Sequence, residues 1–136
     1  MDEATLLLTA EWLGKADEDY RAAKLLIEGG LILPALFHCQ QAAEKALKGY
    51  LCFHHQPVEK THDITKLIDL AGKIDTVWRK RIEEGALLSP LAIEYRYPGD
   101  SEAPDPHLAV TASLAVMEAV RASLPASLFP KTWPTG

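Results

Sequence analysis

The sequence lacks the excess of positive charge that proteins use to coat nucleic acid. Its 14 Lys and Arg residues are outnumbered by 19 Asp and Glu residues, which gives a formal net charge of −5 at pH 7. A general phosphate-binding field draws on clustered Lys and Arg, so this composition excludes a protein that binds nucleic acid through its overall charge. It leaves room for a local basic site.

Cysteines and long hydrophobic runs are also scarce. The only two cysteines, Cys39 and Cys52, lie in segments with helical patterns, and one helix cannot bring residues so far apart into disulfide contact. We therefore expect free thiols in a cytoplasmic protein. The acidic start MDEATLLLTAEW does not resemble a signal peptide, and no apolar run is long enough to cross a bilayer, so we expect no membrane contact.

The motifs of the common enzyme classes are missing. There is no Gly-rich phosphate loop and no Ser-centred nucleophile turn, so kinase and serine hydrolase chemistry have no support. The five histidines and two cysteines match no zinc spacing, and the adjacent His54 and His55 would point to different sides of a helix. We therefore expect neither a metal nor a cofactor.

The residues that are present favour helices. Apolar residues make up 48% of the chain and aromatic residues 7%, and Leu and Ala dominate. The pattern predicts an all-α, up-and-down bundle of four or five helices over residues 1–124, followed by a Pro-rich tail, 125–136, that is extended or disordered. The predicted helices span residues 3–28, 34–54, 61–72, 75–95 with a bend or break at Gly85 and Pro90, and 105–124.

Apolar residues recur at helical spacing within each predicted helix and give the expected core. Helix by helix, the expected core residues are Leu8, Trp12, Tyr20, Ala23 and Ile27; Leu36, Cys39, Ala43, Ala46, Leu47 and Tyr50 or Leu51; Ile64, Leu67, Ile68 and Ala71; Val77, Trp78 and Ile82; and Leu108, Ala112, Ala115, Ala119 and Val120. A bundle this small with so much Leu and Ala should leave an apolar face to cover, which predicts a dimer.

Polar residues on the second predicted helix, in the stretch FHCQQAAEKALKGYL, have a pattern of their own. His38, Gln41, Lys45 and Lys48 recur at spacings of three, four and three, so they line up along one side of the helix. One interpretation is a solvated face with pairs within the helix, such as Glu44 with Lys48. The alternative is a strip that faces a partner or a ligand.

Arg96 lies between two tyrosines, Tyr95 and Tyr97, where a predicted helix meets a Pro-rich loop. Its guanidinium can hold a phosphate through paired donors while a tyrosine ring stacks on a base, which would be a nucleotide-binding arrangement. The alternative is an ion pair with Glu94 or Asp100, with the tyrosines closing the end of the bundle.

Thr61 and His62 stand at a predicted helix start. Backbone N–H groups and the helix dipole favour an anion there, so both residues can contact phosphate. The alternative is a helix cap with a structural His bonded to the neighbouring helix.

Taken together, FHCQQAAEKALKGYL, KTHDITKLI and EYRYP resemble the HEPN domain family, over about Ala10 to Leu124. The resemblance implies a helical bundle that commonly dimerises and that, in prokaryotes, is often encoded beside a minimal nucleotidyltransferase as a toxin-antitoxin or nucleotide-handling pair. For this chain it implies a homodimeric module that binds a nucleotide or RNA, and the candidate binding residues are His38, Gln41, Lys45, Lys48, Thr61, His62, Arg96 and Tyr97.

Many members of this superfamily are metal-independent ribonucleases, marked by an Arg followed about four to six residues later by a His. Here the first His after Arg96 is His107, across the Pro-rich loop, so the marker is absent in its expected form. Two alternatives to the binding module stay open. One is a ribonuclease in which Arg96 stabilises the scissile phosphate and His107 or His62 does the acid and base work. The other is a bundle that only supports a partner.

Overall fold

The computed structural model of the protein describes residues 1–58, 60–88 and 105–135, and every regular element in these residues is helical. The elements are α1 Glu3–Glu28, α2 Ile32–Phe53, α3 Ile64–Gly72, the 3-10 helix η1 Thr76–Arg81, α4 Ile82–Leu87, α6 Pro106–Ser123 and the 3-10 helix η2 Ala126–Leu128. The predicted all-α bundle is confirmed. None of the helices in these ranges is long and apolar enough to span a bilayer.

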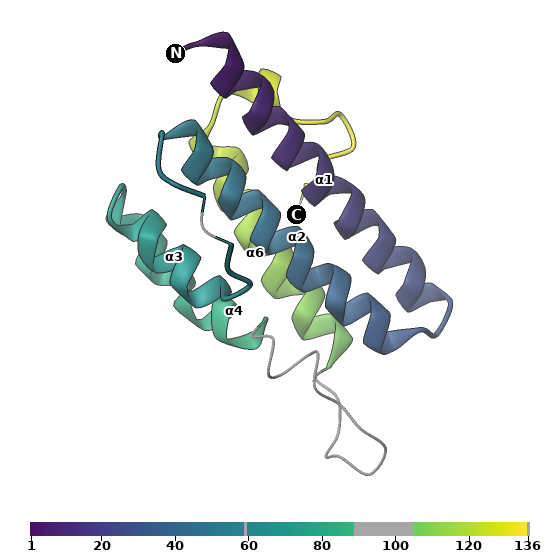
Figure 1. Ribbon diagram of the computed structural model, residues 1–136. Coiled ribbons are helices and arrows are strands. Elements are labelled where there is room, and N and C mark those ends of the chain that lie inside the picture. Colours follow the sequence, from purple (N-terminus) through teal and green to yellow (C-terminus); the bar gives the residue numbers. More distant parts are fainter. Residues whose placement is uncertain (59, 89–104, 136) are drawn as a thin grey trace.

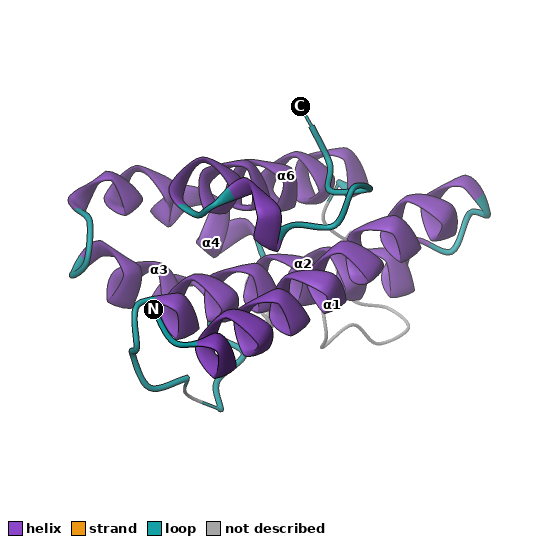
Figure 2. Ribbon diagram, turned by 90° about the horizontal axis from the view of Figure 1, so that it is seen from above, coloured by secondary structure: helices purple, strands orange, loops and turns teal. Residues whose placement is uncertain are grey.

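Helix α2 lies in the middle of the bundle and packs against α1, α3 and α6 (Figure 1). Seen from above, α1 lies beside α2, and α6 lies on the other side of α2 (Figure 2). The Ser113 hydroxyl of α6 donates a hydrogen bond of 3.0 Å to the backbone carbonyl of Cys39 and ties α6 to α2. Polar residues of α2 therefore have neighbours on several sides.

Helix α1 has the predicted bounds, but the prediction for its buried stripe is partly wrong. Asp2 caps its start by accepting a hydrogen bond from the Thr5 N–H at 2.7 Å, and Gly30 follows its end with φ 77°, a conformation that suits glycine. The expected core residue Leu8 is 47% exposed, whereas Leu13, which the pattern left out, is fully buried.

The close approach of α1 to α2 explains this difference. A Cβ atom on Gly49 of α2 would lie 3.0 Å from Leu13 Cδ2 and 3.3 Å from Trp12 Cβ. Because glycine has no side chain, Leu13 packs directly onto the α2 backbone. Leu8 is not on the same side of the helix and faces solvent.

Helices α2 and α3 bury the residues that the pattern predicts. Pro34 lies in the first turn of α2, where its missing N–H removes no helical hydrogen bond. The buried core residues of these two helices include Leu36, Cys39, Ala43, Ala46, Leu47, Tyr50, Leu51, Ile64, Leu67, Ile68 and Ala71.

The connection between α2 and α3 is not a short antiparallel turn. After α2 the chain returns along this helix, so that His62, just before α3, contacts Glu44 in the middle of α2. Beyond the far end of α3, the Trp78 ring lies edge-on to Tyr50, with ring centroids 5.1 Å apart. Helix α3 therefore runs in the same direction as α2 (Figure 1). The contact with Glu44 places His62 on the polar side of α2.

The described part of the fourth predicted helix consists of two short elements, η1 and α4, and most of its expected core is exposed. Trp78 is buried as predicted, but Val77 is 45% and Ile82 37% exposed, and Leu108 at the start of α6 is 54% exposed. A 3-10 helix repeats every three residues, so a stripe placed at α-helical spacing does not stay on one face. The predictions for Val77, Ile82 and Leu108 are wrong.

Gly85 lies inside α4 and does not interrupt it, contrary to the prediction of a bend or break there. A Cβ atom at this position would lie 3.0 Å from Ile68 Cδ1 and 3.2 Å from Thr65 Cα. The glycine therefore serves the close packing of α4 on α3. Pro90, the other expected break, lies outside the described residues.

The tail after α6 is packed against the bundle, so of the two states expected for it, extended or disordered, the disordered one does not apply to residues 125–135. Trp133 is only 6% exposed, and its indole N–H donates a hydrogen bond of 3.3 Å to the Met117 carbonyl of α6. The neighbouring Thr132 hydroxyl donates to the buried Asp17 carboxylate of α1. The tail thus joins α1 to α6.

Candidate functional site

The polar strip of α2, His38, Gln41, Lys45 and Lys48, contacts neighbouring helices rather than lying free in solvent. Gln41 is 9% and Lys48 6% exposed, and the side chains of His38 and Lys45 are 33% and 25% exposed. The interpretation as a solvated face is therefore wrong for Gln41 and Lys48. The expected pair of Glu44 with Lys48 is present, at 3.0 Å.

On the α1 side, Asp19 holds two members of the strip. Its Oδ1 atom lies 2.7 Å from His38 Nδ1, and its Oδ2 atom accepts a hydrogen bond of 2.6 Å from Lys45 Nζ. The Asp19 side chain is 11% exposed, so these charge-assisted contacts are only partly screened by water. We call Asp19, His38 and Lys45 the Asp19 cluster.

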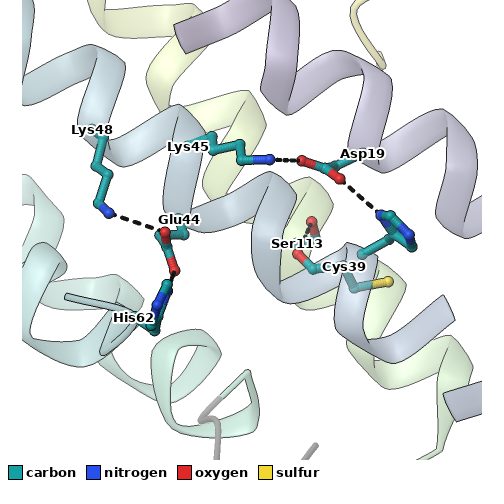
Figure 3. A network of polar contacts seen from close by, with 8 residues as sticks. Asp19, Cys39, Glu44, Lys45, Lys48, His62 and Ser113 are labelled. Carbon is teal, nitrogen blue, oxygen red and sulfur yellow. Dashed lines mark hydrogen bonds and ion pairs between the residues drawn. The ribbon is translucent and has the colours of Figure 1, made fainter. Parts of the chain in front are cut away.

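On the α3 side, Glu44 holds Lys48 and His62, and we call these three residues the Glu44 cluster. Glu44 Oε2 accepts from Lys48 Nζ at 3.0 Å, and Glu44 Oε1 lies 2.9 Å from His62 Nδ1. The side chains of Glu44 and Lys48 are 4% and 7% exposed, whereas that of His62 is 66% exposed. Figure 3 shows Lys45 directed toward Asp19 and Glu44 directed toward His62.

Two adjoining hollows open on the surface beside the Asp19 cluster. The first, of about 290 Å³, is lined by Leu8, Glu11, Trp12, Lys15 and Lys45. The second, of about 220 Å³, is lined by Lys15, Glu18, Asp19, Ala22, His38 and Lys45. Because Lys15 and Lys45 line both hollows, part of the polar strip meets open surface on the α1 side.

The HEPN domain model matches residues 9–124, which is most of the chain and includes both clusters. The chain belongs to the HEPN domain family. Comparisons with curated proteins and with solved structures gave no match. The family predicted from the three sequence motifs is thus confirmed, over nearly the residues that those motifs indicated.

In this HEPN domain, His62 and Thr61 lie before α3 rather than in it. The helix starts at Ile64 and is capped by Asp63, whose carboxylate accepts from the Lys66 N–H at 3.2 Å. The Thr61 hydroxyl accepts from the Asp63 N–H at 3.1 Å. His62 is bonded to Glu44 of α2, as the structural alternative for this residue expected. The predicted start of the helix at residue 61 or 62 is therefore slightly early.

Of the three residues named for the ribonuclease alternative, His62 and His107 lie within the described residues, and only His62 joins one of the two clusters. His107 is exposed in the first turn of α6, where its backbone N–H donates to Asp105 at 2.8 Å. Its side chain contacts neither cluster among the described residues. Arg96 and Tyr97 lie outside the described residues.

Sequence reasoning missed Asp19, Trp12 and Lys15. Asp19 follows buried Ala16 by three residues and precedes buried Ala23 by four, so helical spacing places it at the edge of the buried stripe. A carboxylate at that edge needs a cationic partner, which the strip on α2 supplies. Trp12 was predicted only as a core residue, and Lys15 belonged to none of the sequence patterns.

The remaining reactive groups in the described ranges do not form a second site. Burial raises the pKa of the Cys39 thiol to about 12, so Cys39 is not a nucleophile near neutral pH. Burial also lowers the pKa of His54, with a smaller contribution from the nearby His55. Across the described ranges, no three His, Cys, Asp or Glu side chains are placed to hold a metal ion.

Proposed function

We propose that this HEPN domain is a module that binds a nucleotide or RNA through phosphate contacts. The proposed binding residues are those of the α2 strip and of the two motifs that follow it, namely His38, Gln41, Lys45, Lys48, Thr61, His62, Arg96 and Tyr97.

The observation that carries the proposal is the position of Lys45. Its ammonium group is held 2.6 Å from Asp19, yet it lines both hollows. An ammonium that is already fixed beside an open hollow loses little conformational entropy when it binds phosphate. Its three N–H donors allow it to keep Asp19 as a partner while it donates to a ligand.

The buried Lys48 supports the same surface from beneath. Its ammonium group lies against Glu44 and 5.7 Å from the centre of the Trp12 ring, so it joins the Glu44 cluster to the wall of the first hollow. A cation near an aromatic ring is attracted to the ring face, which helps to fix the position of Trp12.

Calorimetry with ATP and the other nucleoside triphosphates, and with a short single-stranded RNA, tests this proposal. We expect binding heat for the wild-type protein, and weaker binding by about tenfold in Lys45→Ala, because one charge-assisted phosphate contact is lost. Arg96→Ala should also weaken binding. The absence of heat with every nucleotide and with RNA would refute the proposed function.

We further propose that the domain forms a homodimer and acts beside a minimal nucleotidyltransferase in a toxin-antitoxin-like pair. Support for an interface comes from large apolar side chains that are exposed around the turn between α1 and α2, namely Leu25, Leu31, Leu33 and Phe37. A dimer mass at micromolar concentration is expected in light scattering, and a monomer mass would contradict it. Purification of the tagged protein from its native cells tests the pairing, and a minimal nucleotidyltransferase is expected to co-purify.

A direct assay separates the binding module from the ribonuclease alternative. The wild-type protein and the Arg96→Ala variant, both free of metal, are each incubated with single-stranded RNA. A module that only binds leaves the RNA intact in both cases. Cleavage by the wild type that Arg96→Ala abolishes would favour the ribonuclease.

A further inference from the structure

The first hollow brings together three kinds of chemistry. Trp12 contributes an aromatic ring, Lys15 and Lys45 contribute ammonium groups, and Glu11 contributes a carboxylate. Trp12 is partly buried and Lys15 is exposed. Lys45 is shared with the Asp19 cluster, whereas Lys15 makes no ion pair within the described residues. The ammonium group of Lys15 is therefore available to bind a ligand in this hollow.

The charges around the two hollows argue against a long stretch of nucleic acid. Lys15, Lys45 and, when protonated, His38 are positive, but Glu11, Glu18 and Asp19 line the same surface and are negative. A run of phosphates would meet these carboxylates and be repelled. A ligand with one anionic end and a ring that carries N–H donors matches such a mixed lining.

The size of the first hollow also favours a small ligand with one anionic end and one ring system. Its volume of about 290 Å³ lies just below the range of roughly 300–1,000 Å³ that is typical of small-molecule sites. One nucleotide unit is of that order, whereas several consecutive nucleotides are larger. An aromatic ring beside an ammonium group is also the usual combination for stacking a base while its phosphate is neutralised.

We propose that this hollow binds a single nucleoside monophosphate unit, with the base on Trp12, a base amino group donating to Glu11, and the phosphate on Lys15 and Lys45. The inference rests on the proposed function and specifies its ligand and its site. The unit is either a free nucleotide or the phosphorylated end of an RNA, because the recognised chemistry is the same in both. Trp12, Lys15 and Glu11 join the site although none of the sequence motifs includes them.

The test follows Trp fluorescence of the full chain during titration with AMP, GMP, CMP and UMP. Stacking on Trp12 should quench part of the emission. Trp78 and Trp133 are buried elsewhere, so their emission should stay unchanged during the titration. Adenosine and inorganic phosphate should each bind at least about tenfold more weakly than AMP, because each lacks half of the contacts. A short RNA with and without a terminal phosphate shows whether an RNA end competes with AMP.

Three variants locate the site. Measured by calorimetry, which does not need the Trp12 fluorophore, Lys15→Gln and Trp12→Leu should each weaken AMP binding by about tenfold, and Trp12→Phe should weaken it less because a ring remains. Lys73→Gln, which changes an exposed cation at the end of α3, should bind as the wild type does. Lys15 is exposed, so its variant is informative even if Trp12→Leu does not fold.

Each outcome is decisive. Wild-type affinity in Lys15→Gln, when the wild type binds nucleotides, would overturn the hollow as the site and leave the proposed function standing. No binding of any nucleotide or RNA by the wild type would overturn the proposed function itself. Equal affinity for inorganic phosphate and for AMP would overturn the role of Trp12 in base recognition.

Discussion

At the scale of single residues, Glu44 of α2 is a buried carboxylate that holds two partners at once. Its two oxygens hold the buried Lys48 and the return segment through His62. A buried ion pair adds little net stability compared with a well-packed apolar pair, but removing one partner leaves an uncompensated charge. The Glu44 cluster is thus more sensitive to the loss of Glu44 than a count of its hydrogen bonds indicates.

Glu44→Ala should lower the free energy of unfolding by about 3–5 kcal/mol, because the Lys48 ammonium group remains buried without its carboxylate. Urea denaturation measures this change. Glu118→Ala, at an exposed position of α6, should change it by less than about 0.5 kcal/mol. Adding Lys48→Met to Glu44→Ala should recover part of the loss, and a double variant no more stable than the single one would contradict this explanation.

The buried Cys39 thiol should make the free energy of unfolding depend on pH. Its thiol pKa is raised to about 12 by burial, so the folded protein holds this proton more tightly than the unfolded chain does. The stability contributed by Cys39 is therefore complete below the ordinary thiol pKa of 9.0 and is lost as the pH rises toward 12. The unfolding free energy should fall between pH 9 and 11, and fall less in Cys39→Ala. The same fall in both proteins would show that Cys39 is not responsible.

At the scale of elements, glycines set the distances between helices. Gly49 admits Leu13 from α1, and Gly85 brings α4 onto α3. Both positions lie within helices, where glycine is intrinsically unfavourable by about 1 kcal/mol relative to alanine. The packing at these two places therefore outweighs helix propensity.

Gly85→Ala should destabilise the protein by about 1–3 kcal/mol, because its Cβ atom would lie 3.2 Å from Thr65 Cα, an atom of the backbone that cannot move aside alone. Gly14→Ala is the matched control, since a Cβ atom at Gly14 would have no neighbour within 4 Å. This control should stabilise by up to about 1 kcal/mol. Thermal unfolding of the two variants gives the comparison, and shifts of the same sign would refute the role of Gly85.

The helices were predictable from sequence where long apolar periods and their caps agree. This holds for the start of α6, where Asp105 caps the helix before Pro106. Helix α2 keeps its predicted apolar face without a side-chain cap, and α3 keeps its face although it starts at Ile64, later than predicted. The pattern failed at Val77 and Ile82 because short 3-10 and α-helical pieces alternate there. It also missed Asp19 and Trp12 in the candidate site, because both become important only when α1 packs against α2, which local spacing does not specify.

At the scale of the whole molecule, the tail connects parts that are far apart in the chain. Trp133 packs on α6 and lies edge-on to Phe129, with ring centroids 4.9 Å apart, while Thr132 reaches Asp17 in α1. Asp17 is 1% exposed and also pairs with Arg21 at 3.2 Å. The family match ends at residue 124, so this connection lies beyond the matched region.

Trp133→Ala should lower the free energy of unfolding by about 3–5 kcal/mol, the usual cost of removing a buried Trp, because a cavity is left between the tail and α6. Lys131→Ala, an exposed neighbour in the tail, should change it by less than about 0.5 kcal/mol. Guanidinium denaturation checks both values. Equal stability of the two variants would mean that the tail contributes nothing to the fold.

The contact between Thr132 and Asp17 also has a consequence for synthesis of the protein. Translation produces α1 long before it produces Thr132, so a nascent chain carries the Asp17 carboxylate without its hydroxyl partner. Helices α1 and α2 can pair early, since they are neighbours in sequence. We therefore expect the junction between α1 and α6 to form last, and chains truncated before residue 132 to be more easily digested by protease than longer ones.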